Sequence, residues 1–121
     1  MVSRAVSDYR DLEIWKRSID LVEKIYQVTN GFPKDEQFGL ISQMRRAAVS
    51  IASNIAEGYG RYQKNEFRQF LRISIASGAE LITQLIIAQR LGFVEESVSS
   101  KVINELEQIS KMIMSLIKKL K

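Results

Sequence analysis

The chain contains no cysteine and no histidine among its 121 residues. Their absence excludes disulfides, thiolate nucleophiles, imidazole bases and the usual sulfur and nitrogen ligands of zinc. It also excludes the Glu-x-x-His pairs that hold metals inside helical bundles. We therefore expect no metal, no cofactor and no catalytic residue, and we predict that the protein is not an enzyme.

Long apolar runs are missing as well. The uninterrupted apolar stretches are only a few residues long, whereas a helix needs about 20 such residues to cross a bilayer. Residues 1–8 lack the apolar segment of a signal peptide. Together with the absence of cysteine, which fits a reducing compartment, these features predict a soluble, cytoplasmic protein without a membrane partner.

Hydrophobic residues make up 45% of the chain and charged residues 26%, which is an ordinary globular composition. A chain of this length can bury one sizeable core, so we expect a single domain over residues 1–121. The net charge of +4 is unevenly distributed. Residues 1–60 carry eight basic and eight acidic residues, whereas residues 61–92 carry five basic and two acidic ones. A basic segment therefore begins at Arg61.

The stretch 40–61 organises the rest of the chain. Its large apolar residues recur at helical spacing, at Ile41, Met44, Ile51 and Ile55, while alanines and serines fill the positions between them. A helix with such small side chains can be approached closely by several neighbours. We expect it to be the central helix of a bundle, ended by positive φ angles in the glycine turn at 58–60.

Three further helices are predicted from apolar periodicity, with boundaries uncertain by a few residues: 11–30, 64–91 and from 96 or 97 onward. Asn30 and Gly31 are expected to form a left-handed cap before Pro33, the only proline, and Gly92 to end the third helix. The short connections predict an all-α fold, an up-down-up-down antiparallel four-helix bundle.

The third predicted helix is apolar on more sides than one core requires. Ile75, Ile82 and Ile86 lie outside its main heptad series. We expect these isoleucines to form an interface with further copies of the chain, in a homo-oligomer larger than a dimer.

An ordered string of residues, which begins in the first predicted helix and continues through the second and third, resembles the signature of a bacterial four-helix-bundle family, the 23S rRNA intervening-sequence proteins. The matching residues are Asp11–Trp15, Gln43–Ala48, Ser50–Ile51, Asn54–Gly58, Gly60–Arg61, Glu66–Phe67, Phe70–Ile73, Ser77, Ala79–Leu81 and Thr83–Leu85. The chain is also similar to the accessory variability determinant proteins of diversity-generating retroelements, which work with a reverse transcriptase and nucleic acid. The resemblance implies a ring-shaped homo-oligomer, often a pentamer, and an association with ribosomal RNA intervening sequences.

Asn54, Glu57 and Arg61 form a first polar cluster, spaced three and four residues apart so that one helical face can carry them. They could contact a ligand or phosphate beside the glycine turn. The structural interpretation, which we favour, is that Asn54 and Glu57 bond neighbouring groups and fix how the second helix meets the third.

Ser77, Glu80 and Gln84 form a second cluster on one face of the third helix. In an antiparallel bundle, Glu80 comes level with Arg45 and Arg46 if it faces the second helix, or with Lys111 if it faces the fourth. Either ion pair would be structural. A lone carboxylate without a second acid, histidine or metal gives little basis for acid–base catalysis.

A third cluster is basic: Arg61, Lys64, Arg68 and Arg72 follow helical spacing. Tyr59, Tyr62 and Phe67 lie among them in the sequence. Basic side chains beside aromatic rings suit a nucleic-acid backbone whose bases stack on the rings. An ordinary solvated helix face would show the same spacing.

We therefore predict a non-enzymatic homo-oligomeric bundle that binds nucleic acid, most plausibly RNA. Arg61, Lys64, Arg68, Arg72 and Tyr62 are the expected contacts. The alternative is a scaffold that binds a protein partner and uses its basic stripe only for solvation.

Overall fold

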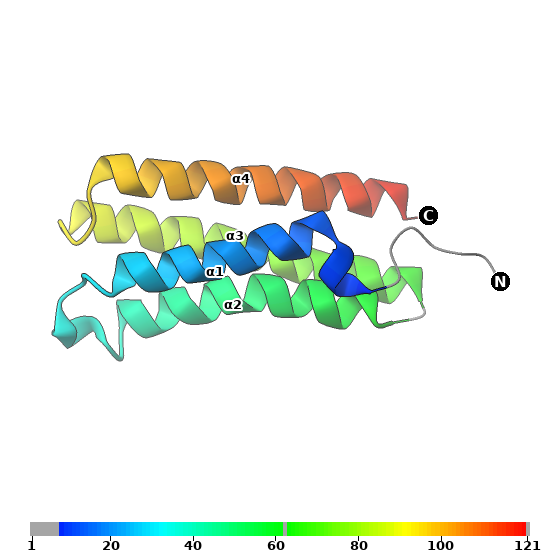
Figure 1. Cartoon of the computed structure of the whole chain (residues 1–121), viewed down its shortest axis with the longest axis horizontal. Coiled ribbons are helices and arrows are strands. Elements are labelled where there is room, and N and C mark those ends of the chain that lie inside the picture. The colour runs from blue at the N-terminus through cyan, green and yellow to red at the C-terminus, as the bar shows by residue number, and fades with distance from the viewer. Residues whose placement is uncertain (1–7, 62, 121) are drawn as a thin grey trace.

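Four α-helices form an antiparallel bundle in the computed structural model, which describes residues 8–61 and 63–120 (Figure 1). The helices are α1 (Glu13–Thr29), α2 (Leu40–Tyr59), α3 (Lys64–Arg90) and α4 (Glu96–Lys119), with short 3₁₀ helices η1 (Tyr9–Asp11) and η2 (Lys34–Glu36). Each helix packs on the next and α4 returns to α1, while the described residues contain no strand. The predicted all-α, up-down-up-down bundle is confirmed.

The core is built from the periodic apolar positions of each helix. On α2 the residues Met44, Ala48, Ile51 and Ile55 are almost completely buried. The heptad series of α3 and the central part of the α4 series are buried beside them: Phe67, Leu71, Ser74, Gly78, Leu81, Leu85, Ala88, Val102, Leu106, Ile109 and Ile113. Small α2 residues at the centre therefore allow both flanking helices to pack closely, as the sequence pattern predicts.

The glycine turn at the end of α2 has no positive φ angle, and its Gly58 instead leaves room for a neighbouring helix. α2 continues to Tyr59, and Gly60 has a φ of −74°. A Cβ added to Gly58 would lie 2.6 Å from the Cβ of Phe70 and 3.0 Å from Cδ1 of Phe67. The expectation of positive φ at this turn is wrong, because Gly58 serves to let α3 approach the α2 backbone.

The left-handed cap expected after α1 is also absent, because Asn30 has a φ of −62°. Within the described ranges, Gly92 alone has a positive φ, of 80°, at the predicted end of α3. The acidic residues that precede α2 in the sequence, Asp35 and Glu36, belong to η2 and not to α2. Glu36 nevertheless caps α2, since its Oε1 accepts a hydrogen bond of 3.1 Å from the Leu40 amide.

Among the described helices, α3 is the only one long and apolar enough, by length and composition, to cross a membrane. In the bundle it is a core helix that packs between α2 and α4. Only 39% of the most apolar 18-residue stretch of α3 is buried, however. Part of its apolar character therefore lies on the surface, where Ile73, Ile86 and Ile87 are between 41% and 47% exposed.

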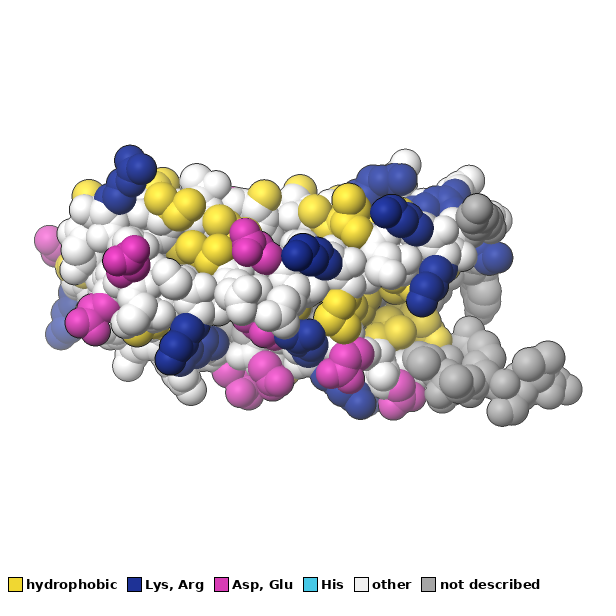
Figure 2. Space-filling model, turned by 90° about the horizontal axis from the view of Figure 1, so that it is seen from above, with side chains coloured by type: hydrophobic (Ala, Val, Ile, Leu, Met, Phe, Trp, Pro, Cys, Tyr) yellow, Lys and Arg dark blue, Asp and Glu magenta, His cyan; other side chains and the backbone are white. Residues whose placement is uncertain are grey.

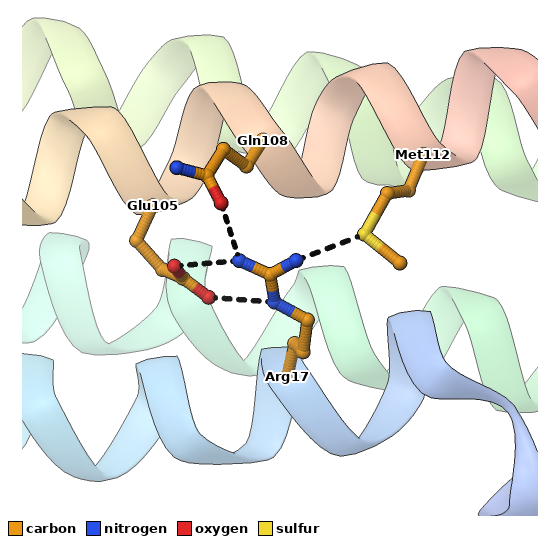
Figure 3. A network of polar contacts seen from close by, with 4 residues as sticks. All are labelled: Arg17, Glu105, Gln108 and Met112. Carbon is orange, nitrogen blue, oxygen red and sulfur yellow. Dashed lines mark hydrogen bonds and ion pairs between the residues drawn. The ribbon is translucent and has the colours of Figure 1, made fainter.

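A charged network joins α1 to α4 (Figure 3). The Arg17 guanidinium donates from Nε and Nη2 to the two Glu105 carboxylate oxygens at 2.9 and 2.8 Å. It also donates to Oε1 of Gln108 at 2.7 Å and to Sδ of Met112 at 3.1 Å. Hydrogen bonding to Glu105 raises the pKa of Arg17 above its ordinary value, so the arginine stays charged.

Candidate nucleic-acid interface

The predicted basic stripe lies at the end of the bundle where α2 turns into α3 and where α4 ends (Figure 1). Lys64 and Arg72 are exposed, and no ion pair joins either of them to another residue of the described ranges. Their spacing of eight residues places them about 12 Å apart on one side of α3. These two cations are fully available to a partner.

The guanidinium of Arg61 is less available to an anionic partner than its exposure suggests. Its Nη2 lies 3.3 Å from Oε2 of Glu57, an exposed pair one helical turn apart. Its guanidinium also lies over the ring of Phe70, 5.0 Å from the ring centre. The nearby carboxylate lowers the positive potential at this position, so Arg61 contributes less to an anion site than Lys64 or Arg72.

Arg68 has a structural role beside any functional one. Its guanidinium donates to the backbone carbonyl of Leu120 and to Oδ1 of Asn65. It therefore ties the end of α4 to the start of α3. A guanidinium has five N–H donors, so donors are left for a phosphate.

The aromatic residues of the predicted site lie mostly inside the bundle. Phe67 is only 9% exposed and packs edge-to-face on Tyr59, with ring centres 5.8 Å apart. Tyr62, the ring predicted to contact nucleic acid, lies outside the described residues. Phe67 is therefore not free to stack on bases, and Tyr59 is half-buried beside it where α2 meets α3.

Two lysines of α4 join the α3 cations. Lys111 lines a groove between α3 and α4 together with Ile75 and Ile82. Lys118 lies two turns further along the same side of α4 and is exposed. Figure 2 shows Lys and Arg side chains gathered toward the end of the bundle where α4 ends. The sequence does not show how α4 is aligned with α3, so it could not place these lysines beside the basic stripe.

The structure separates the first polar cluster into two parts. Nδ2 of Asn54 donates to the backbone carbonyl of Ser50 at 2.8 Å and to its hydroxyl at 3.0 Å. That hydroxyl lies 2.9 Å from the hydroxyl of Ser77 on α3. Asn54 thus belongs to a half-buried chain of bonds between α2 and α3, while Glu57 and Arg61 remain on the surface.

The second cluster contains no ion pair within the described part of the chain. Glu80 is exposed and accepts a bond of 3.3 Å from Nε2 of Gln84, which is itself 5% exposed. Arg45 instead donates to Thr29 at 2.9 Å and lies 4.3 Å from the ring centre of Tyr26. The expected pairing of Glu80 with this arginine is wrong, because Arg45 turns toward α1.

The other two expected partners of Glu80 are not paired with it either. Nη2 of Arg46 contacts Oγ of Ser42 at 3.5 Å. Lys111 belongs to α4 and lines the groove between α4 and α3. The Oε1 atom of Gln84 is buried and has no hydrogen-bond partner among the described residues. In residues 8–61 and 63–120, therefore, no cation forms an ion pair with the exposed Glu80 carboxylate.

The three isoleucines predicted as an interface are not equally accessible. Ile75 and Ile82 are half-buried and pack against the core, whereas Ile86 is 41% exposed. The neighbouring Ile87 and Leu91 are 44% and 57% exposed. The exposed apolar residues of α3 are therefore Ile73 in its N-terminal half and Ile86 and Ile87 near its C-terminal end, which Leu91 follows. Elsewhere, no group of three or more Asp or Glu side chains that could hold a metal occurs in residues 8–61 and 63–120.

Fold and surface together define a small antiparallel helical bundle with one basic end. Residues 10–115 match the 23S rRNA-intervening sequence protein family, so the chain belongs to that family. A solved structure from Bacteroides thetaiotaomicron, described as a protein with unknown function from the S23 ribosomal protein family, has the same fold. It superposes with a TM-score of 0.78 at 21% identity, covering 87% of this chain and 98% of that chain. A search of curated proteins gives no match.

Proposed function

We propose that this protein is a non-enzymatic RNA-binding bundle of the cytoplasm that associates with ribosomal RNA or its intervening sequences. The observation that carries the proposal is the cation surface at the end of the bundle, formed by Lys64, Arg68 and Arg72 with Lys111 and Lys118. One acidic side chain, Glu107, lines the groove together with Lys111, so the cations at this end outnumber it. Such a surface attracts a polyanion, and the name of the family supports an RNA as that polyanion.

Binding should depend strongly on salt and weakly on sequence, because each neutralised phosphate releases counterions. The test is fluorescence anisotropy with a labelled fragment of ribosomal RNA over a series of salt concentrations. Replacing Lys64 and Arg72 together by alanine should weaken binding and flatten the salt dependence by about two units of slope. These two residues are better targets than Arg68, whose loss also releases the end of α4.

The matched control is the double variant Lys24→Ala and Lys101→Ala. Both lysines are exposed and line a groove between α1 and α4, away from the proposed surface. This variant removes the same charge and should bind nearly as the native protein does. Equal losses of affinity in both variants would show that only the net charge of the protein matters. If the native protein shows no salt-sensitive binding, the protein-scaffold alternative replaces the proposal.

We also propose that the chain assembles into a ring of identical copies through the exposed apolar surface of α3. Ile86, Ile87 and Leu91 are 41%, 44% and 57% exposed and lie within six residues of one another, and clustered exposed apolar side chains of this kind mark interaction sites. A cyclic assembly would bring several copies of the basic end into one particle. Repetition would then raise the avidity for a long RNA without any new contact.

Light scattering at micromolar concentration should give several times the mass of one chain. Ile86→Glu is the best test of this interface, because Ile82 packs on the core and its replacement would also disturb the fold. Val49→Glu is the control, since Val49 is 40% exposed on α2 and lines a groove on the α1 side of the bundle. A native protein that scatters as one chain would contradict the proposal, as would an Ile86 variant that assembles normally.

A further inference from the structure

The cations of the basic end form two parallel rows on neighbouring helices. Lys64, Arg68 and Arg72 follow one side of α3 at intervals of one turn, or about 6 Å. On α4, Lys111 borders the groove against Ile75 and Ile82 of α3, and Lys118 lies two turns further along the same side of α4. The bond from Arg68 to the Leu120 carbonyl fixes the two helices together at the end where the rows begin.

The distance between the rows is set by helix packing. Axes of packed helices lie about 8–10 Å apart, and cationic side chains that point outward lie at least that far from one another. An RNA stem is an A-form helix, whose wide, shallow minor groove is bordered by the phosphate chains of both strands. One strand bound along α3 would leave the α4 row without phosphates, whereas two strands can occupy both rows.

Among the described residues, the aromatic side chains at this end of the bundle offer little to an unpaired base. Phe67 and Tyr59 pack on each other, and Phe70 lies beneath the Arg61 guanidinium. The exposed aromatic side chains in the described part of the chain are Tyr26 and Phe38, in α1 and in the connection to α2, at the opposite end of the bundle. Proteins that hold single strands rely on stacking of bases on accessible rings.

We infer that the basic end binds the double-helical part of a nucleic acid, such as an RNA stem, through phosphates of both strands. The inference rests on the proposed function and names the form of RNA that the surface fits. The lysines and arginines contact backbone rather than base edges, so the stem is held by its shape and charge. Base sequence within the stem should therefore matter little.

The test compares two RNAs of equal length and equal phosphate number, one that folds into a hairpin and one unstructured. At moderate salt the hairpin should bind the full-length protein at least about tenfold more tightly, because more phosphates are neutralised at once. A hairpin with a shuffled stem should bind within about threefold of the first. Equal or tighter binding of the unstructured RNA overturns the inference but leaves the proposed function intact. Failure of both RNAs to bind overturns both.

A second variant addresses the α4 row alone. Lys111→Ala with Lys118→Ala should lower hairpin affinity and reduce the salt slope by about two units. The same variant should bind the unstructured RNA with an affinity close to that of the native protein, since one strand follows α3. The Lys24 and Lys101 double variant is again the control. Native affinity of the α4 variant for the hairpin would show that only one row contacts RNA and would overturn the inference.

Discussion

Two helix pairs in this bundle are held by different means. Between α2 and α3, small side chains allow the backbones to approach, and the Ser74 hydroxyl donates to the backbone carbonyl of Ile51 at 2.9 Å. Between α1 and α4 the contact is the least extensive of the four, and the Arg17 network spans it. A groove of about 230 Å³, lined by Leu21 and Val102, lies beside that network. The comparison indicates that close approach of the backbones, with short hydrogen bonds from serine, holds α2 on α3, whereas a network of long charged and polar side chains joins α1 to α4.

The largest expected effect tests the steric fit. Gly58→Ala should destabilise the protein by about 1–3 kcal/mol, because the new methyl group would meet Phe70 and Phe67 and force the helices apart. Gly60→Ala is the control: its Cβ would meet only backbone oxygens at 3.6 Å and beyond. Urea denaturation measures both free energies of unfolding. Equal stability of the two variants would show that α3 can shift on α2 at no cost.

An intermediate effect is expected at the polar interface. Arg17→Met should cost about 1–2 kcal/mol, since it leaves the Glu105 carboxylate without its bidentate partner. A double-mutant cycle with Glu105→Gln should give a coupling energy of about 0.5–1.5 kcal/mol. Arg10→Met removes the more exposed pair with Asp8 and should change stability little. A coupling energy near zero would mean that packing alone holds α1 against α4.

The smallest effect is expected at Glu80, which belongs to neither interface. Glu80→Gln should change the free energy of unfolding by less than about 0.5 kcal/mol, because the carboxylate is exposed and its described contact is Gln84. Thermal melts at protein concentrations below and above the onset of self-association would measure this change in stability. A loss that appears only at high concentration would place Glu80 against another copy of the chain.

Helical periodicity was sufficient to predict the fold. The apolar series of α2, α3 and α4 each specify one buried face, and Gly92 ends α3 as its sequence position indicates. The role of Gly58 was not predictable in this way. A glycine near a helix end is compatible with a turn or with close packing, and the choice depends on Phe70, which α3 brings against it.

The polar interactions were harder to predict because their partners are distant in the sequence. Arg17 and Glu105 are 88 residues apart, and periodicity does not specify which of several facing side chains they meet. The same limit applies to the candidate site. The i, i+4 spacing indicated the α3 row, whereas the contribution of Lys111 and Lys118 depends on the register of α4 against α3.

The separation of 88 residues between the partners of the α1–α4 network has a consequence for the order of folding. α2 and α3 are joined by a short turn, so their interface can form after closure of a small loop, at little entropic cost. The α1–α4 network closes nearly the whole chain and is therefore expected to form last. Weakening Arg17 should accordingly speed unfolding while leaving the rate of folding almost unchanged.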